Sequence, residues 1–178
     1  MLFRSIVTGY DEHGRPLYPK LATDCMNAGC HVWIEKPAAA SCREIEMMQQ
    51  ASLKNNKKLM VGYKKMFFPA NEKAKELASQ EDFGEISMIM AQYPLCIPTP
   101  QTFSRYLDQN VWDDCAVSFL DHLCHPMSLI LYLAGMPQKF YFERSKSGAG
   151  MVTFSYSSGV VVSLAMTHGT SGNGGMER

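Results

Sequence analysis

The stretch Gly-Cys-His-Val-Trp-Ile-Glu-Lys-Pro, at positions 29–37, constrains the fold of this chain more than any other feature. It is typical of the end of a helix, then a short buried strand at 31–35, then a charged pair held before a proline. Ligands of open α/β sheets bind outside the carboxyl ends of the strands, and Lys36 falls at such an end. Most lysines that follow a strand are simply exposed to solvent. Position alone therefore leaves two interpretations of Lys36, as a functional residue or as an exposed surface lysine.

A first βαβ unit leads into this strand. Residues 3–8 are rich in β-forming side chains and give way to turn formers at 9–16. Pro19 suits the first turn of a helix, where no amide hydrogen is missed, and Gly29 suits the position just beyond its end. This order of strand, helix and strand predicts a right-handed crossover between parallel strands.

A second βαβ unit shares the strand at 31–35. Ser41 is placed to cap a helix, and Glu44, three residues later, completes a capping box. Asparagines at 55–56 end that helix, and the apolar run at 58–63 predicts the next strand. The sequence therefore predicts three parallel strands joined by two helices, which is part of a doubly wound α/β sheet.

Beyond Pro69 the pattern changes. An amphipathic helix is predicted at 70–79, with Ala74 and Leu77 facing inward, and a strand is predicted at 85–93. The loss of the strand–helix–strand alternation indicates a second domain of mixed α and β structure.

The remaining residues predict an antiparallel sheet. The stretch at 94–115 carries three prolines and few periodic apolar residues, so we interpret it as a functional loop or lid. A helix is predicted at 119–134, followed by strands at 138–144, 150–157 and 160–167. Because these strands follow one another through short turns, they are expected to pair as antiparallel hairpins.

The composition excludes several classes of protein. Lys and Arg total 17, as do Asp and Glu, so no overall field attracts nucleic acid or an anionic membrane. The apolar run at 130–134 is too short to span a bilayer, and the chain does not open with the charged and apolar regions of a signal peptide. We therefore expect a cytoplasmic protein that binds neither nucleic acid nor membrane.

Six cysteines are present, and none of them forms a Cys-x-x-Cys motif. A disulfide framework is typical of a small, loop-rich secreted chain, whereas most of these cysteines fall in segments predicted as helix or strand. We therefore expect reduced, buried thiols rather than disulfides. The cysteines are Cys25, Cys30, Cys42, Cys96, Cys115 and Cys124.

Asp121 and His125 are the second candidate for chemistry. They are four residues apart, so on a helix they lie one above the other. A carboxylate beside an imidazole fixes its tautomer and raises its basicity, as a general base requires. The alternative is an aspartate that caps the helix and a histidine that packs, and Pro126 predicts a helix start or a bend here. The residues alone leave these two interpretations equally open.

Other polar clusters carry weaker signals. His122 and His125 match neither a His-Glu-x-x-His motif nor a Cys₂His₂ spacing, so no metal site is expected. The aspartates at 113–114 are more typical of a turn than of an acid–base pair. The glycines at 148–150 and 172–175 do not form the Gly-x-Gly-x-x-Gly loop that binds a dinucleotide.

Taken together, these motifs resemble those of the Gfo/Idh/MocA family of NAD(P)-dependent oxidoreductases. The resemblance lies in the stretch at 28–37, in Met-Val-Gly-Tyr at 60–63, and in Asp121 followed four residues later by His125. It extends over about residues 3–168. The Gly-x-His-Val-x-x-Glu-Lys-Pro run is highly specific, whereas the other two motifs gain weight from their order and spacing.

The resemblance implies an α/β fold in two parts. Residues 1–63 would be the carboxyl-terminal part of a Rossmann domain that lacks its glycine-rich loop, and 64–178 an incomplete substrate-binding domain with an open, mostly antiparallel sheet. The loop of the family precedes the first strand found here, and Arg178 falls within the second domain, so the chain is expected to be truncated at both ends. A homo-oligomer through the open sheet is a further expectation.

The resemblance also implies the chemistry. Lys36 would hydrogen-bond the reacting hydroxyl of a sugar or polyol, and His125, oriented by Asp121, would accept its proton while the hydride passes to NAD or NADP. The peptide bond before Pro37 is expected to be cis. The residues implied to contact the cofactor are Thr8, Gly9, Glu35, Lys36 and Pro37, and those implied to contact the substrate are Lys36, Tyr63, Lys65, Asp121 and His125.

A second hypothesis remains open at this point. Without the phosphate-binding loop, the chain lacks the helix N-terminus that holds the dinucleotide, so weak or absent NAD(P) binding is expected. The chain would then be a catalytically silent remnant or an interaction module of the same family.

Overall fold

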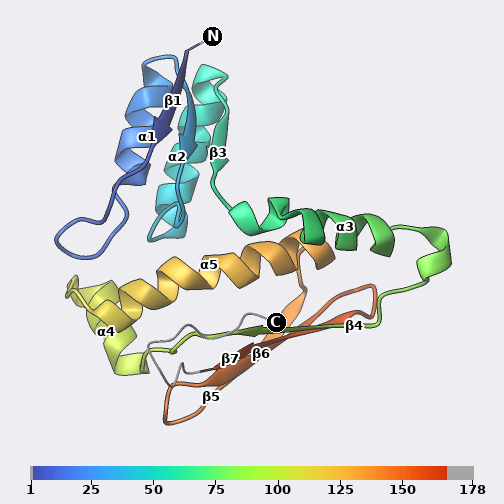
Figure 1. Ribbon diagram of the computed structural model, residues 1–178. Coiled ribbons are helices and arrows are strands. Elements are labelled where there is room, and N and C mark those ends of the chain that lie inside the picture. Colours follow the sequence, from blue (N-terminus) through green and yellow to red (C-terminus); the bar gives the residue numbers. More distant parts are fainter. Residues whose placement is uncertain (1, 168–178) are drawn as a thin grey trace.

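The computed structural model describes residues 2–167, and it begins with a three-stranded parallel sheet (Figure 1). The strands pair in the order β1-β2-β3, and both pairings are parallel, as the two predicted βαβ units require. Val32 and Ile34 of the central strand are at most 1% exposed and pack against both helices, which also contact each other. The elements are β1 (Phe3–Ile6), α1 (Tyr18–Asn27), β2 (His31–Ile34), α2 (Cys42–Asn55) and β3 (Leu59–Val61).

Local signals set the ends of both helices. Pro19 lies in the first turn of α1, and Gly29 follows α1 with a φ of +86°, a conformation that glycine adopts without strain. The Ser41 hydroxyl caps α2 by accepting a hydrogen bond from the Glu44 amide. The Glu44 carboxylate in turn accepts one from the backbone amide of Ala40 at 2.9 Å. The predicted capping box is therefore present, shifted by one residue on its return bond.

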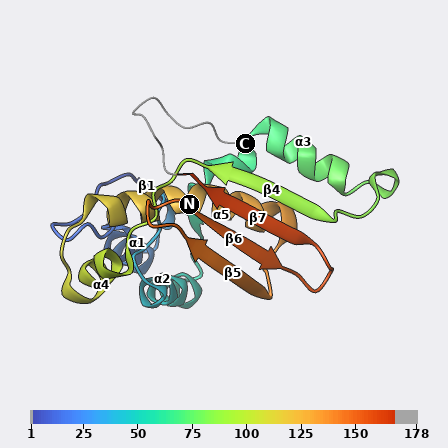
Figure 2. The same cartoon turned by 90° about the horizontal axis from the view of Figure 1, so that it is seen from below.

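The second part is built on a mixed four-stranded sheet in the order β4-β7-β6-β5 (Figure 2). β5, β6 and β7 pair antiparallel through two hairpins, as predicted, and β4 pairs parallel with β7. The elements are η1 (Lys64–Phe67), α3 (Pro69–Ala78), η2 (Glu81–Phe83), β4 (Met88–Tyr93), α4 (Pro100–Gln109), α5 (Asp114–Ala134), β5 (Lys139–Arg144), β6 (Gly150–Ser155) and β7 (Val161–Met166). The predicted domain boundary at residue 63 falls between β3 and η1.

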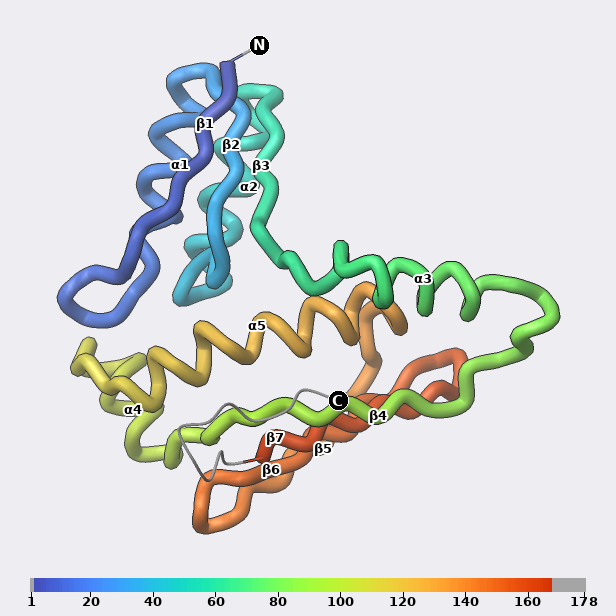
Figure 3. The backbone as a smooth tube through the Cα atoms, in the orientation of Figure 1, coloured from blue at the N-terminus to red at the C-terminus, as the bar shows by residue number. Residues whose placement is uncertain are grey.

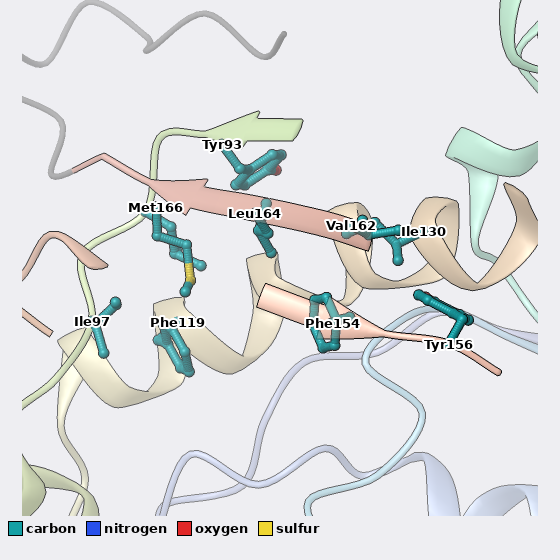
Figure 4. Close-up of a cluster of buried hydrophobic side chains, with 10 residues drawn as sticks. Tyr93, Ile97, Phe119, Ile130, Phe154, Tyr156, Val162, Leu164 and Met166 are labelled. Atoms are coloured by element: carbon teal, nitrogen blue, oxygen red, sulfur yellow. The ribbon is translucent and has the colours of Figure 1, made fainter. Parts of the chain in front are cut away.

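The core of this part lies between α5 and one face of the four-stranded sheet (Figure 4). Val162 and Leu164 of β7 are completely buried, and Phe154 of β6 is 5% exposed. From α5, Phe119 and Ile130 pack against them. Alternate residues of β6 and β7 thus face the helix, which is the pattern of a sheet with one covered face.

The stretch at 94–115 is not the irregular loop that was predicted. It contains α4, whose start is capped by Thr99 accepting a hydrogen bond from the Thr102 amide at 3.1 Å. Tyr106 of this helix is only 2% exposed. Its apolar residues Phe103, Tyr106 and Leu107 do recur at helical spacing, and the helix was missed because they are few among prolines and polar residues. The helix predicted at 119–134 also begins earlier, at Asp114, because the Asp113 carboxylate caps it through the Ala116 amide.

Helix α3 does not bury the side chains that were predicted to face inward. Ala74 and Leu77 are both exposed, and no residue of α3 is buried. The backbone shows the reason, because α3 does not lie over a face of either sheet (Figure 3) and runs beside the outer edge of β4 (Figure 2). The apolar side of α3 borders an open groove along β4, and Ala74 and Ala78 help to line that groove.

Helix α5 is the one helix of the described part that is long and apolar enough to cross a membrane by length and composition. Its buried residues pack on the sheet, as those of a core helix do. Pro126 lies inside α5 and does not end it.

The cysteines all lie among the described residues, and all are free. The expected absence of disulfides agrees with this, but only Cys30 is fully buried, and Cys42 is exposed. Cys96 and Cys115 approach each other to 3.9 Å between their sulfur atoms.

Candidate active site

The carboxyl ends of the three parallel strands meet the middle of α5. The in-register pairing of Ile6 with Ile34, and of Ile34 with Val61, places the residues after each strand at one edge of the sheet. Lys36 is one of these residues, and Asp121 of α5 reaches it from the second part of the molecule. The structure therefore brings together two candidates that the sequence separates by 85 residues.

Lys36 and Asp121 form an ion pair. The Lys36 Nζ lies 2.8 Å from Oδ2 of Asp121, and it also donates to the main-chain carbonyl of Asp121 at 3.3 Å. Their side chains are 17% and 21% exposed, so the pair is largely shielded from water. The peptide bond between Lys36 and Pro37 is cis, as expected. The solvated interpretation of Lys36 is thereby excluded.

The carboxylate of Asp121 has a second partner that sequence reasoning missed. The hydroxyl of Tyr10, in the loop after β1, donates a hydrogen bond to Oδ1 of Asp121. Burial by itself raises the pKa of this carboxyl, but the hydrogen bonds from Lys36 and Tyr10 outweigh it and hold the pKa below its ordinary value. Asp121 is therefore ionised at neutral pH.

His125 is buried, and its Nδ1 makes no hydrogen bond to Asp121. Both oxygens of the carboxylate are taken by Tyr10 and Lys36, and within residues 2–167 the buried Nδ1 of His125 has no hydrogen-bond partner. Burial lowers the pKa of His125 to about 4, and the charges of Lys36, Lys65 and Lys64 add to the effect. The imidazole is therefore neutral at pH 7, and it is free to accept a proton.

The two further residues implied for substrate lie on different sides of α5. Tyr63 lines a shallow, mainly apolar pocket of about 420 Å³ with Cys124 and Met127. Lys65 is only 8% exposed, and its ammonium lies 5.2 Å from the ring centre of Tyr93. Lys65 also lines a separate pocket, bounded by Pro126 among others, so the structure does not place it beside Tyr63.

Cys124 is another residue of this site that the sequence did not single out. Its thiol donates to the carbonyl of Asp121 at 3.1 Å. Burial raises its pKa to about 11, so it is a protonated thiol that packs beside Tyr63. Neither Tyr10 nor Cys124 belongs to a periodic pattern, and no signal in the sequence marks them.

The residues after β1 and β2 that the resemblance assigns to the cofactor lie at the carboxyl edge of the parallel sheet. A side-chain atom added at Gly9 would meet nothing within 4 Å, so the space beside this backbone is open. Thr8 is held in place by the Tyr18 hydroxyl, which donates to its carbonyl at 2.7 Å. The Glu35 carboxylate accepts a hydrogen bond from the Lys36 amide at 3.0 Å. These residues could hold the nicotinamide amide and ribose, whereas residues 2–167 contain no glycine-rich loop for the pyrophosphate.

No metal centre is apparent in this region. Between residues 2 and 167, no three His, Cys, Asp or Glu side chains gather in a way that could hold a metal ion.

Comparison with known proteins shows a family likeness. Residues 13–63 match the model of the GFO_IDH_MocA oxidoreductase family, described as an NAD-binding Rossmann fold. This part of the chain is therefore similar to the Rossmann domain of that family. The match includes the Glu-Lys-Pro turn and the whole of β2, α2 and β3.

Two curated proteins also match part of the chain. The trans-1,2-dihydrobenzene-1,2-diol dehydrogenase of Xenopus laevis is 30% identical over 78 residues, and that of Xenopus tropicalis is 27% identical over the same length. Each alignment covers 44% of this chain and 24% of the relative. The match thus spans about a quarter of these proteins.

Solved structures show the same fold over most of the chain. Myo-inositol 2-dehydrogenase from Lactobacillus plantarum superposes with a TM-score of 0.71 at 21% identity, covering 94% of this chain and 51% of that one. The WlbA dehydrogenase from Bordetella pertussis, solved with NADH and UDP-GlcNAcA, gives 0.69 at 21% identity, covering 94% and 52%. The chain therefore shares the fold of these dehydrogenases over about half of their length.

Proposed function

We propose that this chain carries the active site of an NAD(P)-dependent dehydrogenase that oxidises a ring hydroxyl of a sugar or cyclitol, or reduces the matching ketone. The observation that supports it is the shielded Lys36–Asp121 pair beside a neutral, buried His125, at the carboxyl edge of a parallel sheet. The names of the relatives, which include an inositol and a dihydrodiol dehydrogenase, support an alcohol group on a ring as the reacting centre.

Each residue has a role that follows from its charge state. The Lys36 ammonium, held beside Asp121, is a donor that can hydrogen-bond the reacting oxygen and stabilise negative charge on it. His125 is neutral at pH 7 and can accept the hydroxyl proton. Thr8, Gly9, Glu35 and Pro37 are the remaining residues proposed to face the cofactor, which when bound supplies the hydride acceptor.

Turnover by the chain itself tests this proposal. With NAD or NADP at millimolar concentration and a panel of cyclitols and sugars, we expect measurable formation of the reduced cofactor at 340 nm. Lys36→Ala and His125→Ala should each lower that rate at least a hundredfold. Lys20→Ala, at an exposed lysine 81% open to solvent, is the matched control and should leave the rate unchanged. No turnover with any substrate of the panel would contradict the proposal.

The alternative is a catalytically silent chain, and cofactor affinity bears on it. A missing glycine-rich loop removes the main anchor of the pyrophosphate. We therefore expect that a fluorescence titration with NADH or NADPH shows no saturation below millimolar concentration. Submicromolar binding would contradict this expectation and would weaken the case for a silent chain.

Self-association through the open sheet is a further part of the proposal. The face of the sheet opposite α5 carries exposed apolar side chains, among them Met90 at 75%, Tyr141 at 76% and Met151 at 50% exposure. Scattered apolar residues are common on surfaces, but several large exposed ones on a single face of a sheet are a feature of interaction sites. Sedimentation should show a dimer or larger species that Met90→Glu shifts towards monomer. A monomeric wild type would contradict this part.

A further inference from the structure

Tyr10 joins the first part of the molecule to the candidate site. Its hydroxyl donates to Oδ1 of Asp121, 111 residues away along the chain, and the ring packs beside the small buried cluster of Tyr106, Ala116 and Val117. The other oxygen of the carboxylate, Oδ2, lies 2.8 Å from the Lys36 ammonium. One carboxylate thus links a phenol and an ammonium that come from different strands.

The loop that carries Tyr10 is fastened independently of Asp121. The carboxylate of Asp11 accepts hydrogen bonds from the amides of His13 and Arg15 at 2.8 and 2.9 Å, which closes the loop on itself. The Tyr106 hydroxyl donates to the carbonyl of Gly14 at 2.8 Å and ties the loop to α4. The backbone position of Tyr10 is therefore fixed by contacts that do not involve the carboxylate of Asp121.

The carboxylate has one further titratable neighbour on its own helix. The Nδ1 of His122 is 3.8 Å from Oδ2 of Asp121, and it is also 2.8 Å from the main-chain carbonyl of Ser118. The titratable groups that influence or feel the charge of Asp121 come from the β1 loop, the β2 end, β4 and α5. They are Tyr10, Lys36, Tyr93, His122 and Cys124.

We propose that Tyr10 is a positioning residue that acts on the reaction through Asp121. Its hydroxyl fixes one carboxylate oxygen, so that the other stays directed at Lys36. Lys36 is thereby held with a defined direction at the edge of the sheet. The catalytic consequence rests on the proposed dehydrogenase function, whereas the effect of Tyr10 on the carboxylate does not.

The titration of Asp121 in the 178-residue chain tests this inference without any enzymatic assay. The chain is labelled with ¹³C at the aspartate side-chain carboxyl carbons, and the signal of Asp121 is assigned from its loss in Asp121→Asn. Tyr10→Phe should raise the pKa of this carboxyl by about one, because a hydrogen bond to the charged form is lost. Tyr106→Phe is the matched control, since it removes a hydroxyl that fastens the same loop without touching Asp121. It should leave that pKa unchanged.

A second variant guards against a Tyr10→Phe protein that fails to fold. Replacing Tyr10 with 3-fluorotyrosine keeps the ring and makes the phenol a stronger donor, so the pKa of Asp121 should fall. If Tyr10 only filled space, the Asp121 pKa would not rise in Tyr10→Phe and fall with 3-fluorotyrosine. An Asp121 pKa that is unmoved by the fluorinated residue, or moved equally by Tyr106→Phe, would overturn the inference.

In an assay of turnover, the same inference predicts a kinetic signature. Tyr10→Phe should lower kcat about tenfold, as expected for one hydrogen bond to a charged group, with little change in KM. If the chain shows no dehydrogenase activity, the proposed function fails, but the carboxyl titration still decides the role of Tyr10. A rise of KM with kcat unchanged would instead assign Tyr10 to substrate binding and overturn the positioning role.

Discussion

Replacing Lys36 by methionine isolates the energetic role of its pair with Asp121. At 2.8 Å and an effective dielectric constant of about 20, the gross Coulomb attraction is about 6 kcal/mol, most of which the lost hydration of the two groups cancels. Breaking a fully buried pair costs about 3–5 kcal/mol, and one-fifth exposure reduces this, so we expect a loss of about 2 kcal/mol in unfolding free energy at pH 7. Urea denaturation followed by circular dichroism measures it.

The pH dependence of this loss provides the decisive check. In the wild type, the pKa of Asp121 is below its ordinary value, so its contribution to stability is present above pH 4 and is lost as pH falls through the lowered pKa. In Lys36→Met, burial raises the pKa of the unpaired carboxyl. The folded variant then binds a proton more tightly than its unfolded state, so its deficit against the wild type should shrink as pH falls from 7 towards 4.

Lys20→Met is the matched control for this experiment. Lys20 pairs with Asp24 at 2.5 Å, but the side chains are 81% and 56% exposed, so the change should cost less than about 0.5 kcal/mol at either pH. A Lys36→Met deficit as small as that of Lys20→Met, or one that does not vary with pH, would refute the reasoning.

Three further predictions follow from burial and packing. Gly150→Ala should lower the unfolding free energy by about 2 kcal/mol in urea denaturation, because its new Cβ would lie 2.4 Å from the Ile97 side chain. His125→Asn should reduce the loss of unfolding free energy that the wild type shows between pH 6.5 and 4. The folded histidine has a pKa of about 4, so the unfolded chain binds this proton at higher pH than the folded chain does. An unchanged pH profile would contradict this prediction. Iodoacetamide at pH 7.5 should label exposed Cys42 within minutes and spare Cys124, whose pKa is about 11, as peptide mass mapping can check.

The sequence allowed the parallel part of the fold to be predicted almost element by element. Its helices carry strong end signals, such as Ser41 with Glu44 and the glycine after α1, and its strands are short apolar runs between them. α4 was missed because its apolar stripe is short, with only Phe103, Tyr106 and Leu107 at helical spacing after Pro100. α3 was found, but its inward face was not, because nothing local to a helix tells whether a partner surface exists.

The sequence predicted which residues belong to the candidate site better than it predicted which of them contact one another. Lys36 and Asp121 were placed by motif and resemblance, and the structure pairs them. The spacing of Asp121 and His125 predicted a contact within the helix, but a carboxylate prefers an ammonium and a phenol from outside the helix when both are in reach. Tyr10 could not be found at all, since its role depends on how two distant parts of the chain dock.

The two large hydrophobic cores of this molecule are separate, and the contacts of Asp121 bridge them. Tyr10 and Lys36 belong to elements of the parallel unit, and Asp121 belongs to the helix that covers the other sheet. A small rotation between the units would leave both cores intact and would still separate the phenol, the ammonium and the carboxylate. The ion pair therefore helps to hold the two units together, and the proposed reaction requires that the two units be packed against each other at the carboxyl edge of the parallel sheet.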